Sequence, residues 1–564
     1  MQASIPQRPD SALVHRPHFD AVVIGAGFAG IYMLYRLRKL GLSVRVYERG
    51  DGVGGTWYWN RYPGARCDTE SMTYSYSFSP DLEQDWQWTE RYAPQPEILQ
   101  YANHVADRFD LRRDIEFGPA VTSAVFDEAG QCWHIVTARG EQVSARFCIS
   151  AVGCLSAATL PEFPGLNDFK GEWYHTGQWP HAPVSFVGKR VGIIGTGSSG
   201  VQSTIAIAKE AAYLHVFQRT PNYSIPAWNG PLAPADAARV KANYVAWREA
   251  ARYSQIGIPF ESNGKPAKAV PIEEREREYE AAWAAGGFNF VMAYPDLLMD
   301  IESNRTAAEF VERKIRATVK DPAVAELLTP KDHPIGTKRL CVDTGYYATF
   351  KRDNVTLVDI RTAPIEAITA DGLRTRDTCY ALDVIVFATG FDAITGPLLK
   401  IDIRGRGGER LQDKWADGPR TYLGLATAGF PNFFMITGPG SPCVLSNMLT
   451  SIEQHVDWMA DCIDRLQTQG VATIESQPAA ENAWVQTVHE VGHTTLYPLV
   501  ESWYTGTNIP GKVRMFTPYA GGVGTYRRIC EAVAENHYEG FELVRADGSS
   551  PLAASQSVTA TAAR

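Results

Sequence analysis

DAVVIGAGFAGIYMLYRLRKLGLSVRVYERG, residues 20–50, decides the fold of the first part of the chain. A short apolar run enters a G-x-G-x-x-G motif, apolar residues then recur at near-helical spacing, and a glycine suited to a helix end precedes two alternating valines. The strand positions are Ala21 to Ile24, Val44 and Val46; the motif glycines are Gly25, Gly27 and Gly30; the helix positions are Ile31, Leu34 and Leu37, with Gly41 at the end. This order of strand, helix and strand predicts a βαβ unit.

A second copy of the unit follows in KRVGIIGTGSSGVQSTIAIAKEAAYLHVFQRT, residues 189–220, with motif glycines Gly195, Gly197 and Gly200. In such units the glycines allow a tight turn and a close backbone approach, and the helix N-terminus faces a pyrophosphate. A glycine turn without a ligand is the alternative, but the strand, helix and strand around both motifs favour binding. We therefore predict an α/β protein with two Rossmann-like dinucleotide-binding domains.

The residues at the second strand of each unit predict which dinucleotide binds there. Glu48 lies 23 positions after Gly25, where a carboxylate can accept hydrogen bonds from a ribose diol. The same offset from Gly195 falls on Gln218, followed by Arg219 and Thr220, and a cation without a carboxylate suits a ribose 2′-phosphate. A strand-end surface acid and a solvated arginine are the alternatives.

Two dinucleotides, one of them NADPH, predict FAD at the first site and hydride transfer between the two cofactors. The glycine-rich DGVGGTW, residues 51–57, adds backbone donors near the FAD pyrophosphate through Gly55, Thr56 and Trp57.

Changes in composition and hydrophobic periodicity along the sequence divide the chain into six segments. Residues 225–330 are charged, alanine-rich and helically periodic, which predicts a helical insertion, with Ser303 or Asn304 as the N-cap of one helix. The last twenty residues are small and polar, which predicts a disordered tail. The predicted segments are an FAD-binding domain in two parts (1–155 and 389–544), an NADP-binding domain in two parts (156–224 and 331–388), the helical insertion (225–330) and the tail (545–564).

Composition excludes several other classes of protein. The net charge of −9 and the lack of a basic run argue against a nucleic-acid partner. The nine cysteines are scattered without a C-x-x-C pair, which argues against a disulfide framework, a zinc site or a disulfide reductase, and we expect no metal. No long apolar stretch or export signal occurs, so we expect no membrane association, a cytoplasmic location and a monomer or weak oligomer.

The segment FKGEWYHTGQWP, residues 169–180, contains the spacing Phe169-x-Gly171-x-x-x-His175-x-x-x-Trp179-Pro180. This spacing resembles the fingerprint of the type I Baeyer-Villiger monooxygenases, FAD enzymes that use NADPH and O2 to insert oxygen beside a ketone carbonyl. The resemblance implies that His175 acts at a domain hinge. Without it, His175 would be interpreted as a packed linker histidine.

Further blocks extend the resemblance to about residue 544, most closely to the phenylacetone and steroid monooxygenases. They are GGTWYWNRYPGARCD (54–68), GTKRL (336–340), FATGFDA (387–393), GPGSP (438–442) and SWYTGTNIPGK (502–512). The resemblance implies these roles: Arg339 as the active-site arginine, Asp68 as its carboxylate partner, Lys338 with Arg219 on the NADP phosphate, Cys443, Val444 and Leu445 in a substrate loop, and Trp503 on a mobile loop near the cofactor.

These residue types fit the implied chemistry. A flavin C4a-peroxide attacks a carbonyl only when it is deprotonated, and a neighbouring arginine favours that form and stabilises the negative tetrahedral adduct. A purely structural Asp68–Arg339 pair is the alternative. The sequence thus predicts conversion of ketones to esters or lactones. N- or S-oxygenating flavin monooxygenases and a non-catalytic dinucleotide-binding flavoprotein are the competing hypotheses.

Overall fold

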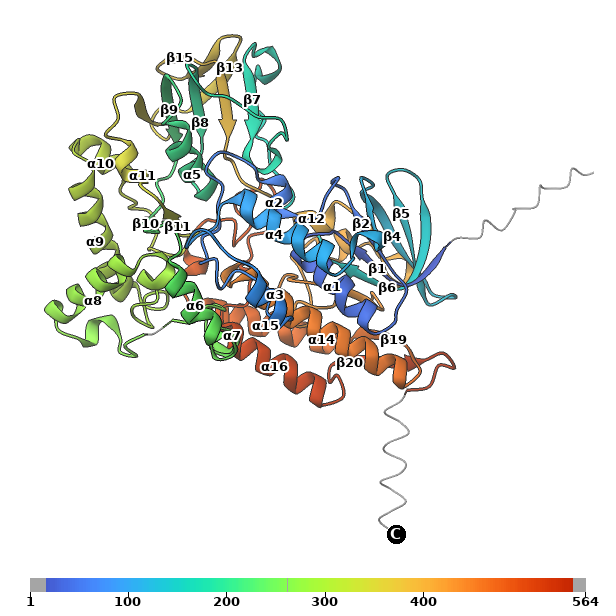
Figure 1. The fold of residues 1–564 in the computed structure, drawn as a ribbon. Helices are drawn as coiled ribbons and strands as arrows, with labels where there is room; N and C mark the ends of the chain where they lie inside the picture. The colour runs from blue at the N-terminus through green and yellow to red at the C-terminus, as the bar shows by residue number, and fades with distance from the viewer. Residues whose placement is uncertain (1–16, 261, 551–564) are drawn as a thin grey trace, which may run out of the picture.

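The computed structural model describes residues 17–260 and 262–550. Figure 1 shows two lobes built on separate sheets, a group of helices beside one lobe, and C-terminal helices that run beneath the other. The α/β class with two Rossmann-like domains and a helical insertion is confirmed. Of the tail predicted for 545–564, residues 551–564 lie outside the described residues, and Arg545 closes a strand. The predicted segment boundaries stay a prediction.

The first βαβ unit forms as the sequence predicts. Strand β1 (His18–Ile24) leads into α1 (Phe28–Lys39) and β2 (Val44–Glu48), and β1 pairs in parallel with β2. The strand begins at His18, three residues before the predicted apolar run. Gly25 has φ +105° and a Cβ there would lie 2.7 Å from the Ala151 carbonyl oxygen, so the turn requires glycine.

The sheet of the first lobe continues this unit on both sides. Its order is β17-β4-β5-β6-β1-β2-β3, with β18 pairing β6, and the strands around β1 are parallel while β4, β5 and β6 are antiparallel. The remaining strands are β3 (Ile115–Phe117), β4 (Val121–Asp127), β5 (Cys132–Thr137), β6 (Gln142–Ser150), β17 (Asp402–Arg404) and β18 (Phe433–Met435). Two distant parts of the chain therefore complete one sheet.

The second lobe holds a five-stranded, wholly parallel sheet of order β12-β9-β8-β16-β7. Its strands are β7 (Glu172–His175), β8 (Arg190–Ile194), β9 (Tyr213–Gln218), β12 (Val355–Asp359) and β16 (Val384–Phe387), and α5 (Ser198–Ile207) joins β8 to β9. A small antiparallel sheet, β13 (Ile365–Thr369), β14 (Gly372–Thr375) and β15 (Cys379–Ala381), lies beside it. The fingerprint segment thus supplies the edge strand β7.

Helices fill the chain between two short paired strands, β10 (Ser224–Pro226) and β11 (Cys341–Asp343). They are α6 (Pro234–Ala242), α7 (Tyr244–Tyr253), α8 (Ile272–Ala285), α9 (Ile301–Thr318) and α10 (Pro322–Leu328). The predicted N-cap of α9 is wrong. Asp300 caps the helix by accepting from the Ser303 N–H at 2.7 Å, while the buried Asn304 side chain donates inside the fold to the Ile335 carbonyl.

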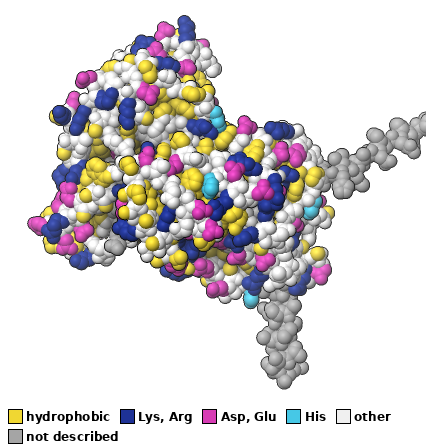
Figure 2. Space-filling model, in the orientation of Figure 1, with side chains coloured by type: hydrophobic (Ala, Val, Ile, Leu, Met, Phe, Trp, Pro, Cys, Tyr) yellow, Lys and Arg dark blue, Asp and Glu magenta, His cyan; other side chains and the backbone are white. Residues whose placement is uncertain are grey.

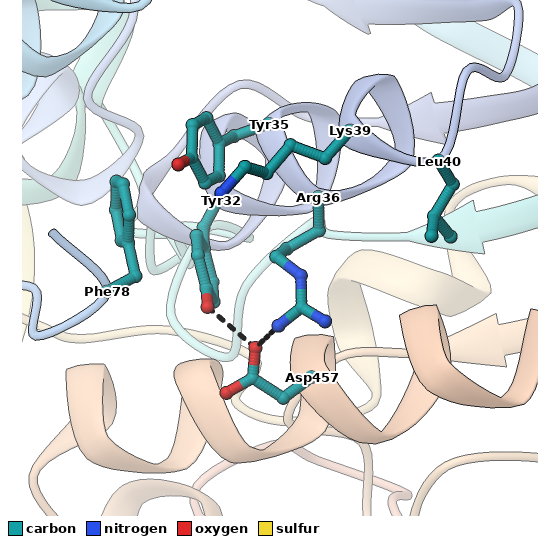
Figure 3. Close-up of a pocket in the computed structure, with 7 residues that line it drawn as sticks. All are labelled: Tyr32, Tyr35, Arg36, Lys39, Leu40, Phe78 and Asp457. Atoms are coloured by element: carbon teal, nitrogen blue, oxygen red, sulfur yellow. Dashed lines mark hydrogen bonds and ion pairs between the residues drawn. The ribbon is translucent and has the colours of Figure 1, made fainter. Parts of the chain in front are cut away.

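The C-terminal helices cover the first sheet. Helix α14 (Met448–Thr468) packs on α1, and Figure 3 shows Tyr32 and Arg36 of α1 pointing at Asp457 of α14. The Tyr32 hydroxyl donates to Asp457 at 2.6 Å and Arg36 forms an ion pair with the same carboxylate. These residues line a surface hollow of about 360 Å³ that contains no predicted site residue.

The remaining elements complete the two lobes. They are α2 (Thr56–Trp59), α3 (Pro80–Asp85), α4 (Gln95–Arg108), α11 (Tyr346–Thr349), α12 (Gly396–Leu399), α13 (Leu411–Lys414), α15 (Pro478–His493), α16 (Val523–Glu535), β19 (Val471–Ser476) and β20 (Phe541–Arg545). Figure 2 shows basic and acidic side chains interspersed over one face of the molecule. Within the described residues, no helix combines the length and apolarity needed to cross a bilayer. All nine cysteines are free.

Candidate active site and dinucleotide cradles

The first cradle forms where two glycine turns meet. Helix α1 begins after Gly27 and α2 begins after Gly55, and neither helix has a side-chain cap. A Cβ on Gly55 would lie 2.9 Å from the Gly27 Cα, and Gly55 has φ +53°, so this turn requires glycine at position 55. The uncapped N–H groups of α1 and the close glycine turns fit the pyrophosphate of FAD.

Glu48 lies at the end of β2 beside this cradle. Its carboxylate oxygens accept from the Ala26 and Gly50 N–H groups, each at 2.8 Å, and the side chain is buried. Burial raises the pKa of the carboxyl, and the two backbone donors partly offset that rise. Each oxygen retains a further lone pair, so the predicted ribose contact is chemically compatible with these bonds and stays a prediction.

Thr56 and Trp57 begin α2, directly after the glycine turn of this cradle. The Trp57 indole N–H donates to the Tyr74 hydroxyl at 3.1 Å, and the Gln95 amide donates to the Trp57 carbonyl. Thr56 is exposed at the first position of the helix.

The second cradle repeats the geometry at α5, which begins after Gly197 and also has no side-chain cap. Gly195 has φ +111°, and a Cβ on Gly200 would lie 2.1 Å from the Gly195 carbonyl oxygen. A Cβ on Gly197 would meet no atom within 4 Å. The open space before an uncapped helix fits the NADP pyrophosphate.

This contrast gives a paired prediction. We expect Gly197→Ala to leave the melting temperature unchanged but to raise the KM for NADPH, because its methyl group would enter the space that the pyrophosphate needs. We expect Gly200→Ala to lower the melting temperature, because its methyl group overlaps backbone. Thermal unfolding and NADPH titration of both variants check this. Equal effects of the two substitutions would contradict the assignment of the cradle.

Two cations lie beside the second cradle. Arg219 follows β9, is exposed, and makes no hydrogen bond or ion pair within residues 17–260 and 262–550. The Lys338 amine donates to the Glu501 carbonyl at 2.5 Å, and burial, together with the charge of Arg219, lowers its pKa. The charge of Arg219 is one of the contributions that lower the pKa of Lys338, which fits two cations beside one phosphate site.

The two residues that flank Arg219 in sequence, Gln218 and Thr220, make hydrogen bonds within the fold. The Gln218 amide donates to the Leu327 carbonyl at 2.7 Å and is buried, so the residue at the acidic position of the motif joins β9 to α10. The Thr220 carbonyl accepts from the Thr196 hydroxyl at 2.8 Å, which closes the glycine turn.

Arg339 and Asp68 form the central ion pair of the site. Arg339 Nε and Nη2 donate to Asp68 Oδ2 at 2.9 and 2.7 Å, and Nη1 donates to the Val444 carbonyl at 2.8 Å. The side chains retain 27% and 22% of their exposure, so the pair borders an opening. Burial opposes the charge of Arg339, but the Asp68 carboxylate outweighs burial and the pKa of the guanidinium is raised.

Local structure positions the arginine. Arg339 lies two residues before β11, and the Asn222 amide donates to its carbonyl at 2.9 Å. The pairing of β10 with β11 therefore brings Arg339 next to Asn222, although 117 positions separate them in sequence.

Sequence reasoning missed two neighbours of Arg339. The guanidinium lies 5.0 Å from the centre of the Phe288 ring, which comes from the helical segment, and the Tyr504 hydroxyl acts on its pKa. Tyr504 follows Trp503 in the block SWYTGTNIPGK and could have been predicted from the resemblance. No local sequence pattern indicates that Phe288 lies at the site.

The predicted substrate loop lies directly beside the arginine. Cys443, Val444 and Leu445 form one 3-10 turn, and they share an apolar cluster with Trp503 and Tyr504. The Trp503 and Tyr504 rings are 4.2 Å apart. The block that contains both rings, residues 502–512, ends at Lys512, whose amine forms an ion pair with Asp392 at 2.5 Å. The structure thus brings together Arg339, Asp68, the substrate loop and Trp503.

The fingerprint residues lie elsewhere, at the connections between the lobes. The His175 ring accepts from the Gly177 N–H at 3.0 Å through Nδ1, and its Nε2 lies 3.2 Å from the Thr389 hydroxyl, which donates to the Thr159 carbonyl. Burial lowers the pKa of His175. Since Thr159 and Thr389 belong to the two connecting segments, a neutral His175 links both to β7.

The other fingerprint residues support this strand. Phe169 and Trp179 are buried in two apolar clusters, and a Cβ on Gly171 would lie 2.4 Å from the Asp383 carbonyl oxygen. Pro180 ends the segment and is half-buried.

One grouping of metal-ligating side chains was not expected. Asp127, Cys132 and His134 of the β4–β5 hairpin place ligand atoms within 4.8 Å of one another. None of these is a predicted site residue, and the absence of a metal from the reaction stays a prediction.

Comparison with known proteins agrees with this geometry. A family model described as flavin-binding monooxygenase-like matches residues 20–228. The chain is 46% identical to a Baeyer-Villiger monooxygenase of Pseudooceanicola batsensis, over 92% of this chain and 95% of that protein. It is 44% identical to a phenazine N-monooxygenase of Lysobacter antibioticus, over 95% and 99%.

A solved structure of oxidised steroid monooxygenase bound to NADP superposes with a TM-score of 0.90 at 55% identity, covering 93% of this chain and 99% of that one. Identity at this level over nearly the whole length shows shared family as well as shared fold. The chain belongs to the type I Baeyer-Villiger monooxygenase family of FAD-dependent, NADP-binding enzymes.

Proposed function

We propose that this enzyme converts ketones into esters or lactones with NADPH and O2, and that Arg339 is the catalytic residue that Asp68 positions. The observation that carries the proposal is the Arg339–Asp68 pair, in which one carboxylate oxygen receives two guanidinium N–H groups. The Val444 carbonyl accepts a hydrogen bond from a third guanidinium nitrogen, Nη1. The guanidinium is thereby fixed in direction before any substrate enters.

A fixed guanidinium suits oxygen insertion beside a carbonyl. Attack on a ketone carbonyl produces a negatively charged tetrahedral adduct, and a preorganised cation stabilises charge at the oxygen where it develops. Arginine keeps its proton throughout because its pKa is high, and here the Asp68 carboxylate raises that pKa further. Arg339 therefore supplies charge and hydrogen bonds but transfers no proton.

The geometry of the two cradles supports an assignment of each cofactor to a part of the chain. We assign FAD to Gly25, Gly27, Gly30 and Glu48 with the turn of Gly55, Thr56 and Trp57. We assign NADPH to Gly195, Gly197 and Gly200, with Arg219, Thr220 and Lys338 around its 2′-phosphate and Trp503 nearby. When bound, FAD accepts hydride from NADPH and, once reduced, activates O2.

The hinge contacts support a positioning role for the fingerprint. His175 touches both connections between the lobes, and burial disfavours its charged form. We infer that it sets the relative position of the two cradles and performs no proton transfer. The cytoplasmic location and the monomeric or weakly oligomeric state stay predictions.

The substrate loop gives a prediction about selectivity. We expect Val444→Ala to change the ranking of ketones while leaving the rate of flavin reduction by NADPH constant, because the side chain lies in the apolar cluster and only its backbone carbonyl meets Arg339. Initial rates over a panel of aryl, cyclic and linear ketones, with stopped-flow flavin reduction, check this. An unchanged ranking would place the substrate pocket elsewhere.

A second candidate reaction is oxygenation of an aromatic nitrogen. It is favoured by the similarity to the phenazine N-monooxygenase. Incubation with NADPH and matched panels of ketones, phenazines and sulfides, followed by product masses, separates the two. Ester or lactone as the main product supports our proposal, and N-oxide as the main product contradicts it.

A further inference from the structure

Two buried cysteines from distant parts of the chain meet beside the substrate loop. The sulfur atoms of Cys154 and Cys443 are 3.0 Å apart, and the side chains retain 5% and 0% of their exposure. Cys154 Sγ also lies 3.3 Å from the Thr437 carbonyl oxygen. A disulfide has a sulfur–sulfur bond of about 2.05 Å, so a shift of about 1 Å would allow one to form.

Cys154 belongs to a segment that connects the two lobes, and Cys443 belongs to the substrate loop. Cys154 lies in the first connection between the lobes, and its carbonyl accepts from the Ile394 N–H of the second connection at 2.8 Å. Cys443 begins the substrate loop in a left-handed conformation, with φ +48°. The next residue, Val444, accepts from Arg339. A bond between the sulfurs would therefore join the hinge to the backbone that orients Arg339.

The two thiols differ in acidity. The hydrogen bond from Cys443, followed by burial, acts on Cys154, and the net effect lowers the pKa of the Cys154 thiol. The same contact and burial raise the pKa of Cys443. Since the thiolate is the nucleophile and Cys154 is the less completely buried of the two cysteines, we take Cys154 as the attacking sulfur and Cys443 as the resolving one.

We propose that Cys154 and Cys443 form an oxidisable dithiol that hydrogen peroxide converts to a disulfide, a modification that restrains the substrate loop. Cys154 sulfur attacks one peroxide oxygen, the O–O bond breaks, and the other oxygen leaves as water with the thiol proton. Cys443 sulfur then attacks the Cys154 sulfenic acid, the S–O bond breaks, and its hydroxyl leaves as a second water with the Cys443 proton. Two thiols lose two electrons, and one peroxide becomes two waters.

The consequence for catalysis rests on the proposed function. Because the disulfide displaces the residue next to the Val444 carbonyl, it disturbs the third hydrogen bond of Arg339. We expect the ester formed per NADPH consumed to fall in the oxidised enzyme and to return after reduction with dithiothreitol. The two cradles are not altered, so NADPH continues to reduce the flavin.

The test treats FAD-loaded enzyme with hydrogen peroxide, alkylates the remaining thiols after denaturation and maps the peptides by mass. Wild type is compared with Cys154→Ser, with Cys154→Ala in case serine disturbs folding, and with Cys148→Ser as a control. Cys148 is as fully buried as Cys443, and burial raises its pKa to about 12. We expect a peptide that joins positions 154 and 443 in wild type and Cys148→Ser, and none in the Cys154 variants.

Alkylation of both cysteines after peroxide treatment, or their separate oxidation to sulfinic acids, would overturn the proposal. The ester yield per NADPH is then measured before and after treatment. Cys154→Ser is expected to keep its own untreated yield, and a full loss of yield in that variant would overturn the assigned consequence. Peptide mapping needs no ketone, so an enzyme that forms the disulfide but makes no ester from any ketone contradicts the proposed function alone.

Discussion

Replacing Arg339 with alanine is expected to remove ester formation while FAD stays bound. The variant loses the guanidinium that Asp68 and Val444 orient, and removing one preorganised donor at a developing oxyanion typically costs about 10²- to 10³-fold in rate. Since neither glycine cradle contains Arg339, NADPH should still reduce the flavin, and the consumed O2 should appear as hydrogen peroxide. Stopped-flow reduction and reoxidation, together with product analysis, measure each step.

The matched variant for this experiment is Asp68→Asn, which keeps the shape of the partner but removes its charge. We expect a smaller loss of ester than in Arg339→Ala, because the guanidinium remains but is less firmly oriented. Flavin absorbance and thermal unfolding report whether either variant has lost FAD or its fold. Ester production by Arg339→Ala at a rate near wild type would show that the pair is structural.

The second large effect is expected from Arg219→Ala. Arg219 is exposed and has no partner within the described part of the chain, so its guanidinium is available for a 2′-phosphate beside Lys338. A hydrogen bond to a charged group contributes about 1.5 to 3 kcal/mol, which corresponds to about 10- to 150-fold weaker NADPH binding. The use of NADH, which has no 2′-phosphate, should be spared.

Arg190→Ala provides the control for this prediction. Arg190 lies at the other end of the same sheet, where β8 begins, and forms an exposed ion pair with Asp383 at 2.7 Å. Such pairs contribute little, so we expect no change with either cofactor. The measurement is the KM for NADPH and for NADH in all three enzymes. Equal losses of both cofactors in Arg219→Ala would show that this residue does not recognise the phosphate.

Local sequence patterns predicted the elements to which we assign the cofactors. Glycine spacing and near-helical periodicity identified β1, α1 and α5, because these features depend on short-range geometry that each segment carries by itself. The resemblance, rather than periodicity, pointed to Arg339 and Asp68, which are 271 positions apart. Their meeting depends on the packing of three separate segments.

Contacts that depend on tertiary packing were not predicted. Gln218 occupies the ribose position of the motif, but its side-chain amide donates to the Leu327 carbonyl of α10. Asp300 caps α9 instead of the predicted Ser303 or Asn304, because the helix begins three or four residues earlier than expected and Asp300 has the extended backbone of an N-cap. Phe288 and Cys154 carry no local signal, and each meets the site only in the folded chain.

The most direct test of the central claim follows the oxygen atom. The enzyme is supplied with NADPH, ¹⁸O2 and a ketone that it accepts, and the masses of the product and of the water are measured. Our account predicts an ester or lactone that contains one atom of ¹⁸O, with the second atom in water. An unlabelled product, or NADPH consumption that yields only hydrogen peroxide with every ketone tested, would contradict it.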